Sequence, residues 1–118
     1  MNKAKYTKDG WLVSAVIAKQ VCDELNDKYN IFSFNYTIEK TYIHIYFTRH
    51  KKFIKKIGFI NQETLDFHVS KFADGKAMNQ MERRIKYNNL SESKDDIQKV
   101  VDYLIISKIN PWKGVYVD

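Results

Sequence analysis

The sequence predicts an α+β fold, a two-layer sandwich in which helices pack on one face of an antiparallel sheet. Near the N-terminus and in the C-terminal third, apolar residues recur every three or four positions, as on a helix face. Between residues 32 and 69 they alternate with polar residues, as in half-buried strands. The 118 residues are 44% hydrophobic, which suffices for one core, so we expect a single α+β domain over residues 1–118.

An amphipathic N-terminal helix is expected first. Charged residues occupy the side opposite its apolar positions. Asp9 is placed to cap the start of this helix, and Asn30 to end it in a left-handed conformation. Cys22 falls on the packing side, where we expect it to fill the core and not to act as a nucleophile. The apolar positions are Leu12, Val13, Val16, Ile17, Val21 and Leu25.

A meander of strands follows. Residues 32–39 and 42–48 alternate strictly and are joined by a short turn, which is typical of an antiparallel hairpin. The stretch from Arg49 to Ile60 fits either a strand or a short helix, and we favour a strand because it lies between strong strand patterns. Residues 65–69 alternate again. The expected sheet therefore has three or four antiparallel strands.

Two helices are expected after the sheet, packed on one of its faces. The first is short and runs from Asp74 to residues 88–89. The second begins near Ser93, which has capping-box spacing to Asp96, and stops at Asn110 before a proline. The complete expectation is an N-terminal helix, a three- to four-stranded antiparallel β-meander, and two helices.

The clearest functional feature is a run of cations near the centre of the chain. No acidic residue occurs between Lys40 and Gln62, so sequence neighbours do not neutralise this run, and the whole chain carries a formal net charge of +6. Lysines bind phosphates through counterion release without reading base sequence. The competing interpretation is a solvated loop whose lysines protect a strand edge from aggregation. The run consists of Arg49, His50, Lys51, Lys52, Lys55 and Lys56.

An aromatic row is expected beside these cations. If the isoleucines of the strand at 42–48 face the core, Tyr42, His44 and Tyr46 face the other way. Sheets that bind single-stranded nucleic acid use such rings for stacking. The alternative is that these rings are half-buried under a helix or at a dimer interface. An exposed aromatic face is also a surface through which a homodimer can form.

A second basic group, Arg83 and Arg84, is expected on the short helix after the sheet. It would extend the basic surface, although such residues often pair with nearby carboxylates such as Glu82. We rank it below the central run.

No pattern typical of an enzyme, a cofactor site or a metal site occurs. The four glycines are scattered and form no phosphate-binding loop, and the three histidines and Cys22 lack metal-ligand spacing. We therefore expect no catalytic residues, no cofactor and no metal.

A cytoplasmic protein is expected. The single cysteine cannot form an internal disulfide, which fits a reducing compartment. The lysines before the apolar run Trp11–Ala18 superficially resemble a signal peptide, but Asp9 and Lys19 do not fit that pattern. No apolar stretch approaches the ~20 residues that a membrane span needs.

The composition is rich in Lys, Asn, Ile and Tyr, as AT-rich coding produces. In this respect the chain resembles the small basic accessory proteins of phages and mobile elements, among which anti-CRISPR and other anti-defence proteins are common. We therefore expect a non-enzymatic accessory protein that binds nucleic acid or a nucleoprotein complex through its basic hairpin. The alternative is a protein-binding inhibitor of a host defence or nucleic-acid-processing complex.

Overall fold

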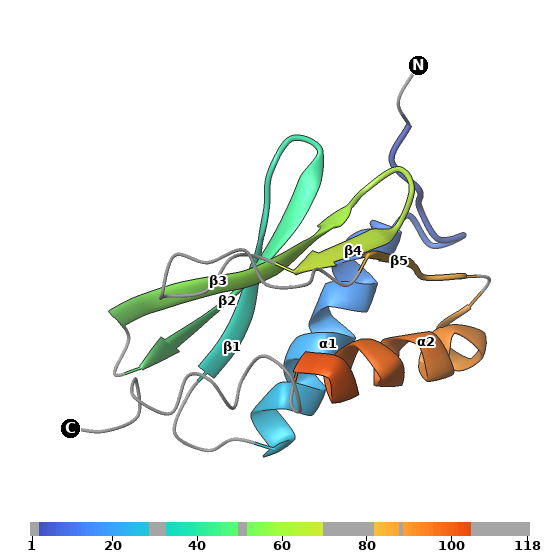
Figure 1. Ribbon diagram of the computed structural model, residues 1–118. Helices are drawn as coiled ribbons and strands as arrows, with labels where there is room; N and C mark the ends of the chain where they lie inside the picture. The colour runs from blue at the N-terminus through green and yellow to red at the C-terminus, as the bar shows by residue number, and fades with distance from the viewer. Residues whose placement is uncertain (1–2, 29–32, 50–51, 70–81, 88, 105–118) are drawn as a thin grey trace.

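The computed structural model describes residues 3–28, 33–49, 52–69, 82–87 and 89–104 (Figure 1). These residues form two helices and five strands, which confirms the α+β class. In chain order the elements are α1 (Val13–Lys28), β1 (Ser33–Ile38), β2 (Tyr42–Arg49), β3 (Lys52–Asn61), β4 (Asp66–Val69), β5 (Glu82–Arg84) and α2 (Leu90–Tyr103).

The sheet is an antiparallel meander in the order β1-β2-β3-β4-β5. The stretch from Arg49 to Ile60 supplies the end of β2 and most of β3, so the strand interpretation was right. The expected three or four strands become five in the structure. Both helices lie on the same side of this sheet (Figure 1), where α1 packs on β1, β2 and β3 and α2 packs against α1. The opposite face of the sheet carries no helix in the described part of the chain.

The prediction of a helix from Asp74 to residues 88–89 is wrong for the described residues of β5. Residues 82–84 form β5, which pairs with β4 through Asp66↔Arg84 and Phe67↔Arg83. Residues 70–81 lie outside the described part. The free edge of β4 offers backbone groups that need partners, and pairing there outweighs a weak helical pattern. Arg83 and Arg84 therefore belong to a strand.

The segment before α1 replaces the expected Asp9 cap. The amide of Val13 donates to the carbonyl oxygen of Lys5 at 2.9 Å, so a backbone group satisfies this donor at the helix start. Tyr6 and Leu12 form an isolated antiparallel bridge, which closes the intervening residues into a loop. We call residues 5–12 the N-terminal loop.

The helix α2 begins earlier than the expected Ser93. Its N-cap is Asn89, whose side-chain oxygen accepts from the amide of Glu92 at 2.9 Å. Ser93 is fully buried in the first turn. Asp96 instead accepts from the amide of Lys86 at 3.0 Å, which ties the helix to the end of β5.

The core lies between the helices and the inner face of the sheet. The side-chain amide of Asn26 in α1 accepts from the amide of Phe34 at 2.7 Å and donates to its carbonyl at 3.1 Å, which fixes α1 against the edge strand β1. Cys22 is 3% exposed, and burial raises the pKa of its thiol to about 12. It therefore packs as an apolar residue. The largest fully buried side chains are Phe34, Phe67, Ile17, Leu25, Ile43, Ile45, Ile57, Ile60, Ile85 and Ile97.

Candidate functional site

The face of the sheet that points away from α1 carries a row of rings. Ile43 and Ile45 are fully buried. Tyr42, His44 and Tyr46 alternate with them and therefore lie on the opposite side, which we call the open face. On this face, residues that pair directly across neighbouring strands lie side by side.

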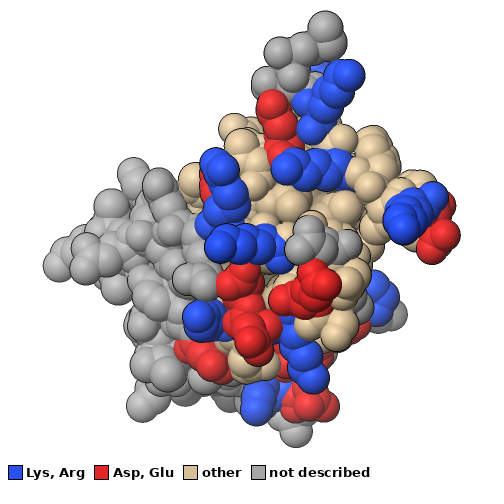
Figure 2. Space-filling model, turned by 90° about the vertical axis from the view of Figure 1, so that its right-hand side faces the viewer, with Lys and Arg blue, Asp and Glu red and all other residues tan. Residues whose placement is uncertain are grey.

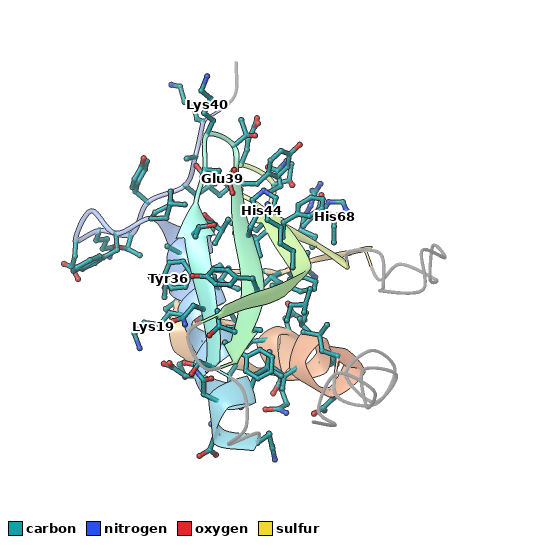
Figure 3. All side chains as sticks on the ribbon, turned by 90° about the vertical axis from the view of Figure 1, so that its left-hand side faces the viewer. Lys19, Tyr36, Glu39, Lys40, His44 and His68 are labelled. Carbon is teal, nitrogen blue, oxygen red and sulfur yellow. The ribbon has the colours of Figure 1, made fainter. Side chains whose placement is uncertain are left out.

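One line of pairs crosses the open face from β1 to β4. Thr37 pairs with His44, His44 with Phe59, and Phe59 with His68. Figure 3 views the sheet from this side and shows His44 and His68 below the turn that carries Glu39. Tyr42 lies next to this line, because it precedes His44 by two residues in β2 and therefore faces the same side.

The rings along this line are in mutual contact. The centroids of Phe59 and His68 are 4.8 Å apart at an interplanar angle of 16°, a stacked pair. Tyr42 meets Phe59 edge-on at 5.1 Å and 78°, and His44 meets Phe59 at 5.7 Å and 45°. Tyr42 is 37% exposed. The result is a continuous surface of four rings centred on Phe59, and we call it the ring row.

A bulge in β3 determines which of its residues reach the ring row. Ile45 pairs with Gly58 but Tyr46 pairs with Lys56, so the register shifts and Ile57 is the extra residue. Ile57 is 1% exposed and packs in the core. Without this shift Lys56 would face the core, whereas with it Lys56 lies beside Tyr46 on the open face.

Glycine is required at the bulge. A β-carbon on Gly58 would lie 2.6 Å from the carbonyl oxygen of His68 and 3.0 Å from the Phe67 ring. The close approach of β3 and β4 therefore depends on a missing side chain at this position.

Charges flank the ring row at the end of the β1-β2 turn. The Glu39 carboxylate lies 3.7 Å from Nε2 of His44 and 3.9 Å from Nζ of Lys56. Thr37 donates to the same carboxylate at 3.4 Å. Lys56 thus has a cross-strand acidic neighbour that lies just outside the acid-free stretch of sequence.

His44 is held in its neutral form near pH 7. Burial and the charge of Lys56 lower the pKa of His44, against the opposing effect of Glu39. Its Nδ1 atom is buried and has no hydrogen-bond partner among the described residues. A neutral imidazole beside Phe59 is an uncharged ring on the open face.

A second ion pair lies at the other edge of the open face. Nε of Arg84 in β5 donates to Asp66 Oδ1 in β4 at 3.3 Å. The Arg84 side chain is 68% exposed, so it remains accessible to an anion in spite of this pair. The structure therefore places Lys56 and Arg84 on opposite sides of the ring row, on β3 and β5.

For the other cations of the predicted run, the structure gives the strand pairing or does not describe the residue. Arg49 pairs with Lys52 at the end of the β2-β3 hairpin, and Lys55 pairs with Phe47 two steps further in. Lys51 and His50 lie outside the described residues. The described cations of the run therefore belong to one hairpin, with Lys56 nearest the ring row.

Sequence reasoning missed Phe59 as a site residue and weighed His68 only as a metal ligand. Strict alternation through β3 is broken by the bulge, so it does not show that Phe59 and Lys56 share a face. The glycine before Phe59 was the available signal, because an isolated glycine inside a strand indicates a bulge or a close backbone approach. Among the described residues no group of three potential metal ligands occurs, and the Phe59 ring lies between the two histidines.

The side of the molecule that carries the helices has charged residues of both signs. In Figure 2, which shows this side, acidic and basic side chains are mixed over the lower part, and basic ones prevail toward the top. In the described residues no helix is long and apolar enough to cross a membrane.

Comparison with known proteins found no match among family models, curated proteins or solved structures.

Proposed function

We propose that the protein binds single-stranded nucleic acid on the open face of its sheet. The observation that carries this proposal is the ring row of Tyr42, His44, Phe59 and His68. Unpaired bases stack on aromatic faces whatever their identity, and each stacked base contributes about 1–3 kcal/mol. A row of contacting rings across neighbouring strands suits successive bases of an extended strand.

The charges near the row fit phosphate binding without sequence reading. Lys56 and Arg84 flank the rings on opposite sides, and the hairpin that leads away from Lys56 carries Arg49, Lys52 and Lys55. Lysine-dominated contacts give affinity that falls steeply with salt. Since duplex bases are already stacked and paired, a ring row favours single strands over duplexes.

The expected role is that of an accessory protein without catalytic chemistry. The buried Cys22 and the net charge of +6 of the whole chain fit a cytoplasmic protein that acts on nucleic acid or on a nucleoprotein complex. An inhibitor that binds a protein partner is the second candidate, and the observation that favours it is a pair of exposed aromatic side chains on the N-terminal loop, Tyr6 and Trp11, at 63% and 68% exposure.

The test is a fluorescence anisotropy titration with a labelled oligothymidylate and a labelled duplex at about 50 and 200 mM salt. We expect the single strand to bind more tightly than the duplex, with affinity that falls at the higher salt. Tyr42→Ala should weaken single-strand binding by about fivefold or more. Trp11→Ala is the matched control, because it removes an exposed aromatic side chain that does not belong to the ring row.

The charge arm uses Glu39→Gln. Removal of the carboxylate at 3.9 Å from Lys56 frees that cation, so the variant should bind the single strand more tightly than the wild type. Replacing Lys51, Lys52, Lys55 and Lys56 together with Gln should flatten the salt dependence. Equal affinity for duplex and single strand, or equal effects of Tyr42→Ala and Trp11→Ala, would contradict the proposal.

A further inference from the structure

The N-terminal loop is held in place by a set of backbone and side-chain hydrogen bonds. Thr7 is at its centre: its amide donates to the carbonyl of Trp11 at 2.8 Å, and its hydroxyl accepts from the amide of Trp11 at 3.0 Å. Gly10, at φ +86°, donates to the carbonyl of Thr7 at 3.0 Å. The amide of Lys5 donates to the carbonyl of Gln62 at 3.3 Å, which joins the loop to the β3-β4 turn.

This ordered loop carries the two most exposed large hydrophobic side chains of the described residues, Trp11 and Tyr6. An exposed tryptophan on an ordered loop buries little surface, so it contributes little to the stability of the fold. Trp and Tyr on a preorganised surface are the residues that contribute most at protein interfaces, because they bury large areas at low entropic cost.

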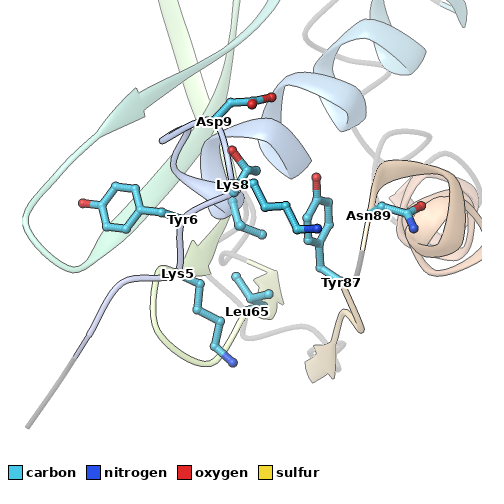
Figure 4. Close-up of a pocket in the computed structure, with 9 residues that line it drawn as sticks. Lys5, Tyr6, Lys8, Asp9, Leu65, Tyr87 and Asn89 are labelled. Carbon is cyan, nitrogen blue, oxygen red and sulfur yellow. The ribbon is translucent and has the colours of Figure 1, made fainter.

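A hollow of about 710 Å³ lies between the loop and the start of α2 (Figure 4). Its floor is apolar: Val13 and Leu65 line it and are each 3% exposed. Leu65 adopts a left-handed φ of 63°, a conformation that leucine rarely takes, with its side chain packed in the core. The hollow is therefore a concave, partly apolar surface of the size that binding sites have.

The rim of this hollow is predominantly basic. Lys5 and Lys8 line it, with Tyr87 and Asn89 on the side of α2. Among the described residues that line the hollow, Asp9 is the one acid. Figure 4 shows the Lys8 side chain extended toward Tyr87 across the hollow, while that of Lys5 points away from the loop. This rim complements carboxylates that surround an apolar side chain.

We propose that this hollow and the N-terminal loop form a docking site for an acidic segment of a partner protein. One aliphatic side chain of that segment packs on Val13 and Leu65. Its carboxylates pair with Lys5 and Lys8. Tyr6, which lines the hollow, and Trp11, which lies on the same loop outside the lining, contact the residues of the segment on either side. A protein segment fits better than nucleic acid, because the apolar floor suits an aliphatic side chain. This site lies on the N-terminal loop and the start of α2. It adjoins the ring row, because Tyr6 also lines a second hollow together with Tyr42, but it does not rest on the nucleic-acid binding proposed above.

The experiment uses Trp11 as its own reporter. The chain has two tryptophans, so Trp112→Phe leaves Trp11 as the single emitter. The probe is a short N-acetylated peptide in which one leucine is flanked on both sides by glutamates. We expect its addition to shift Trp11 emission to shorter wavelength, with a Kd that rises with salt.

Three comparisons test the chemistry of the site. Lys5→Glu with Lys8→Glu should weaken the peptide by about tenfold or more, whereas Lys28→Glu with Lys99→Glu, an equal change of net charge on exposed helix positions, should leave it nearly unchanged. A peptide with alanine for leucine should bind more weakly, and one with lysine for glutamate should not bind. Circular dichroism of each variant verifies the fold.

Three results would overturn the proposal: no emission change with the peptide, equal effects of the two charge-reversed pairs, or a larger response of Trp11 to the oligothymidylate than to the peptide. The last would assign the loop to nucleic acid. Phe59→Leu changes the ring row at a residue that lines neither this hollow nor the one shared by Tyr6 and Tyr42. Loss of oligonucleotide binding in that variant should therefore leave the peptide result unaffected, and the two proposals fail independently.

Discussion

The ring of Phe59 stacks on the imidazole of His68 from the neighbouring strand, with their centroids 4.8 Å apart and their planes at 16°. The two residues pair directly in the β3-β4 ladder, so the sheet itself sets their spacing. Tyr42 and His44 meet the same phenylalanine from β2. Phe59 is thus the residue through which the rings of three strands make one surface.

Phe59→Leu should separate stacking from stability. Leucine keeps most of the apolar volume, so the free energy of unfolding should fall by less than about 1.5 kcal/mol. The flat ring is lost, so the affinity for a labelled oligothymidylate should fall by about fivefold or more. Urea denaturation and anisotropy titration measure the two quantities. An unchanged affinity would mean that the ring row does not contact bases.

His44 should make stability depend on pH. Its folded-state pKa lies below the usual value near 6.5, because the side chain is partly buried and lies near the charge of Lys56. As pH falls through 6.5 the unfolded chain takes up a proton more readily than the folded one, so the free energy of unfolding falls. His44→Phe cannot take up this proton. The wild type should therefore lose stability relative to this variant between pH 7.5 and pH 5, as measured by urea denaturation across about that range.

Glu39→Gln serves as the second variant in that series. Glu39 raises the pKa of His44 and so opposes its depression. Without this carboxylate the loss of stability on acidification should continue to lower pH than in the wild type. Parallel stability curves for the wild type and His44→Phe would contradict both expectations.

Gly58→Ala should disturb the bulge that brings Lys56 to the open face. The added β-carbon would lie 2.6 Å from the carbonyl oxygen of His68, so β3 and β4 must separate, at a cost of about 1–3 kcal/mol in the free energy of unfolding. Gly10→Ala is the comparison, since a β-carbon there meets nothing within 4 Å and the cost is the left-handed backbone, about 1–2 kcal/mol.

The readout that distinguishes these two glycine variants is binding. Gly58→Ala should also weaken the oligothymidylate, because Phe59 and Lys56 shift with the strand. Gly10→Ala should leave that affinity near the wild-type value. Anisotropy titration and urea denaturation on the same samples give both numbers. A larger loss of affinity in Gly10→Ala than in Gly58→Ala would mean that the bulge does not position the binding site.

Several features could be predicted because they depend on local sequence. Strict alternation between Phe34 and Ile38 and again through β2 gave the first hairpin, since the pleat puts successive side chains on opposite faces. Helical spacing likewise located α1. The residues of β2 that face away from the core were identified by the same rule.

Other features depend on contacts that no local pattern contains. The whole of β5 lies within the segment for which a helix was predicted, because the spacing up to Ile85 is helical and the free edge of β4 cannot be seen in the sequence. The start of α2 was placed at Ser93, although Asn89 caps it, since both residue types favour helix starts and packing chose between them.

The sequence by itself determined the α+β class, the first helix, the antiparallel hairpins and the side of β2 on which Tyr42 and His44 lie, because these follow from periodicities of two and 3.6 residues. Tertiary structure alone decided that Phe59 joins those rings, that Glu39 reaches Lys56, and that the N-terminal loop caps α1 and borders a hollow. Register across strands and the bulge at Gly58 set these contacts, and both arise from pairing and packing between segments distant in the chain.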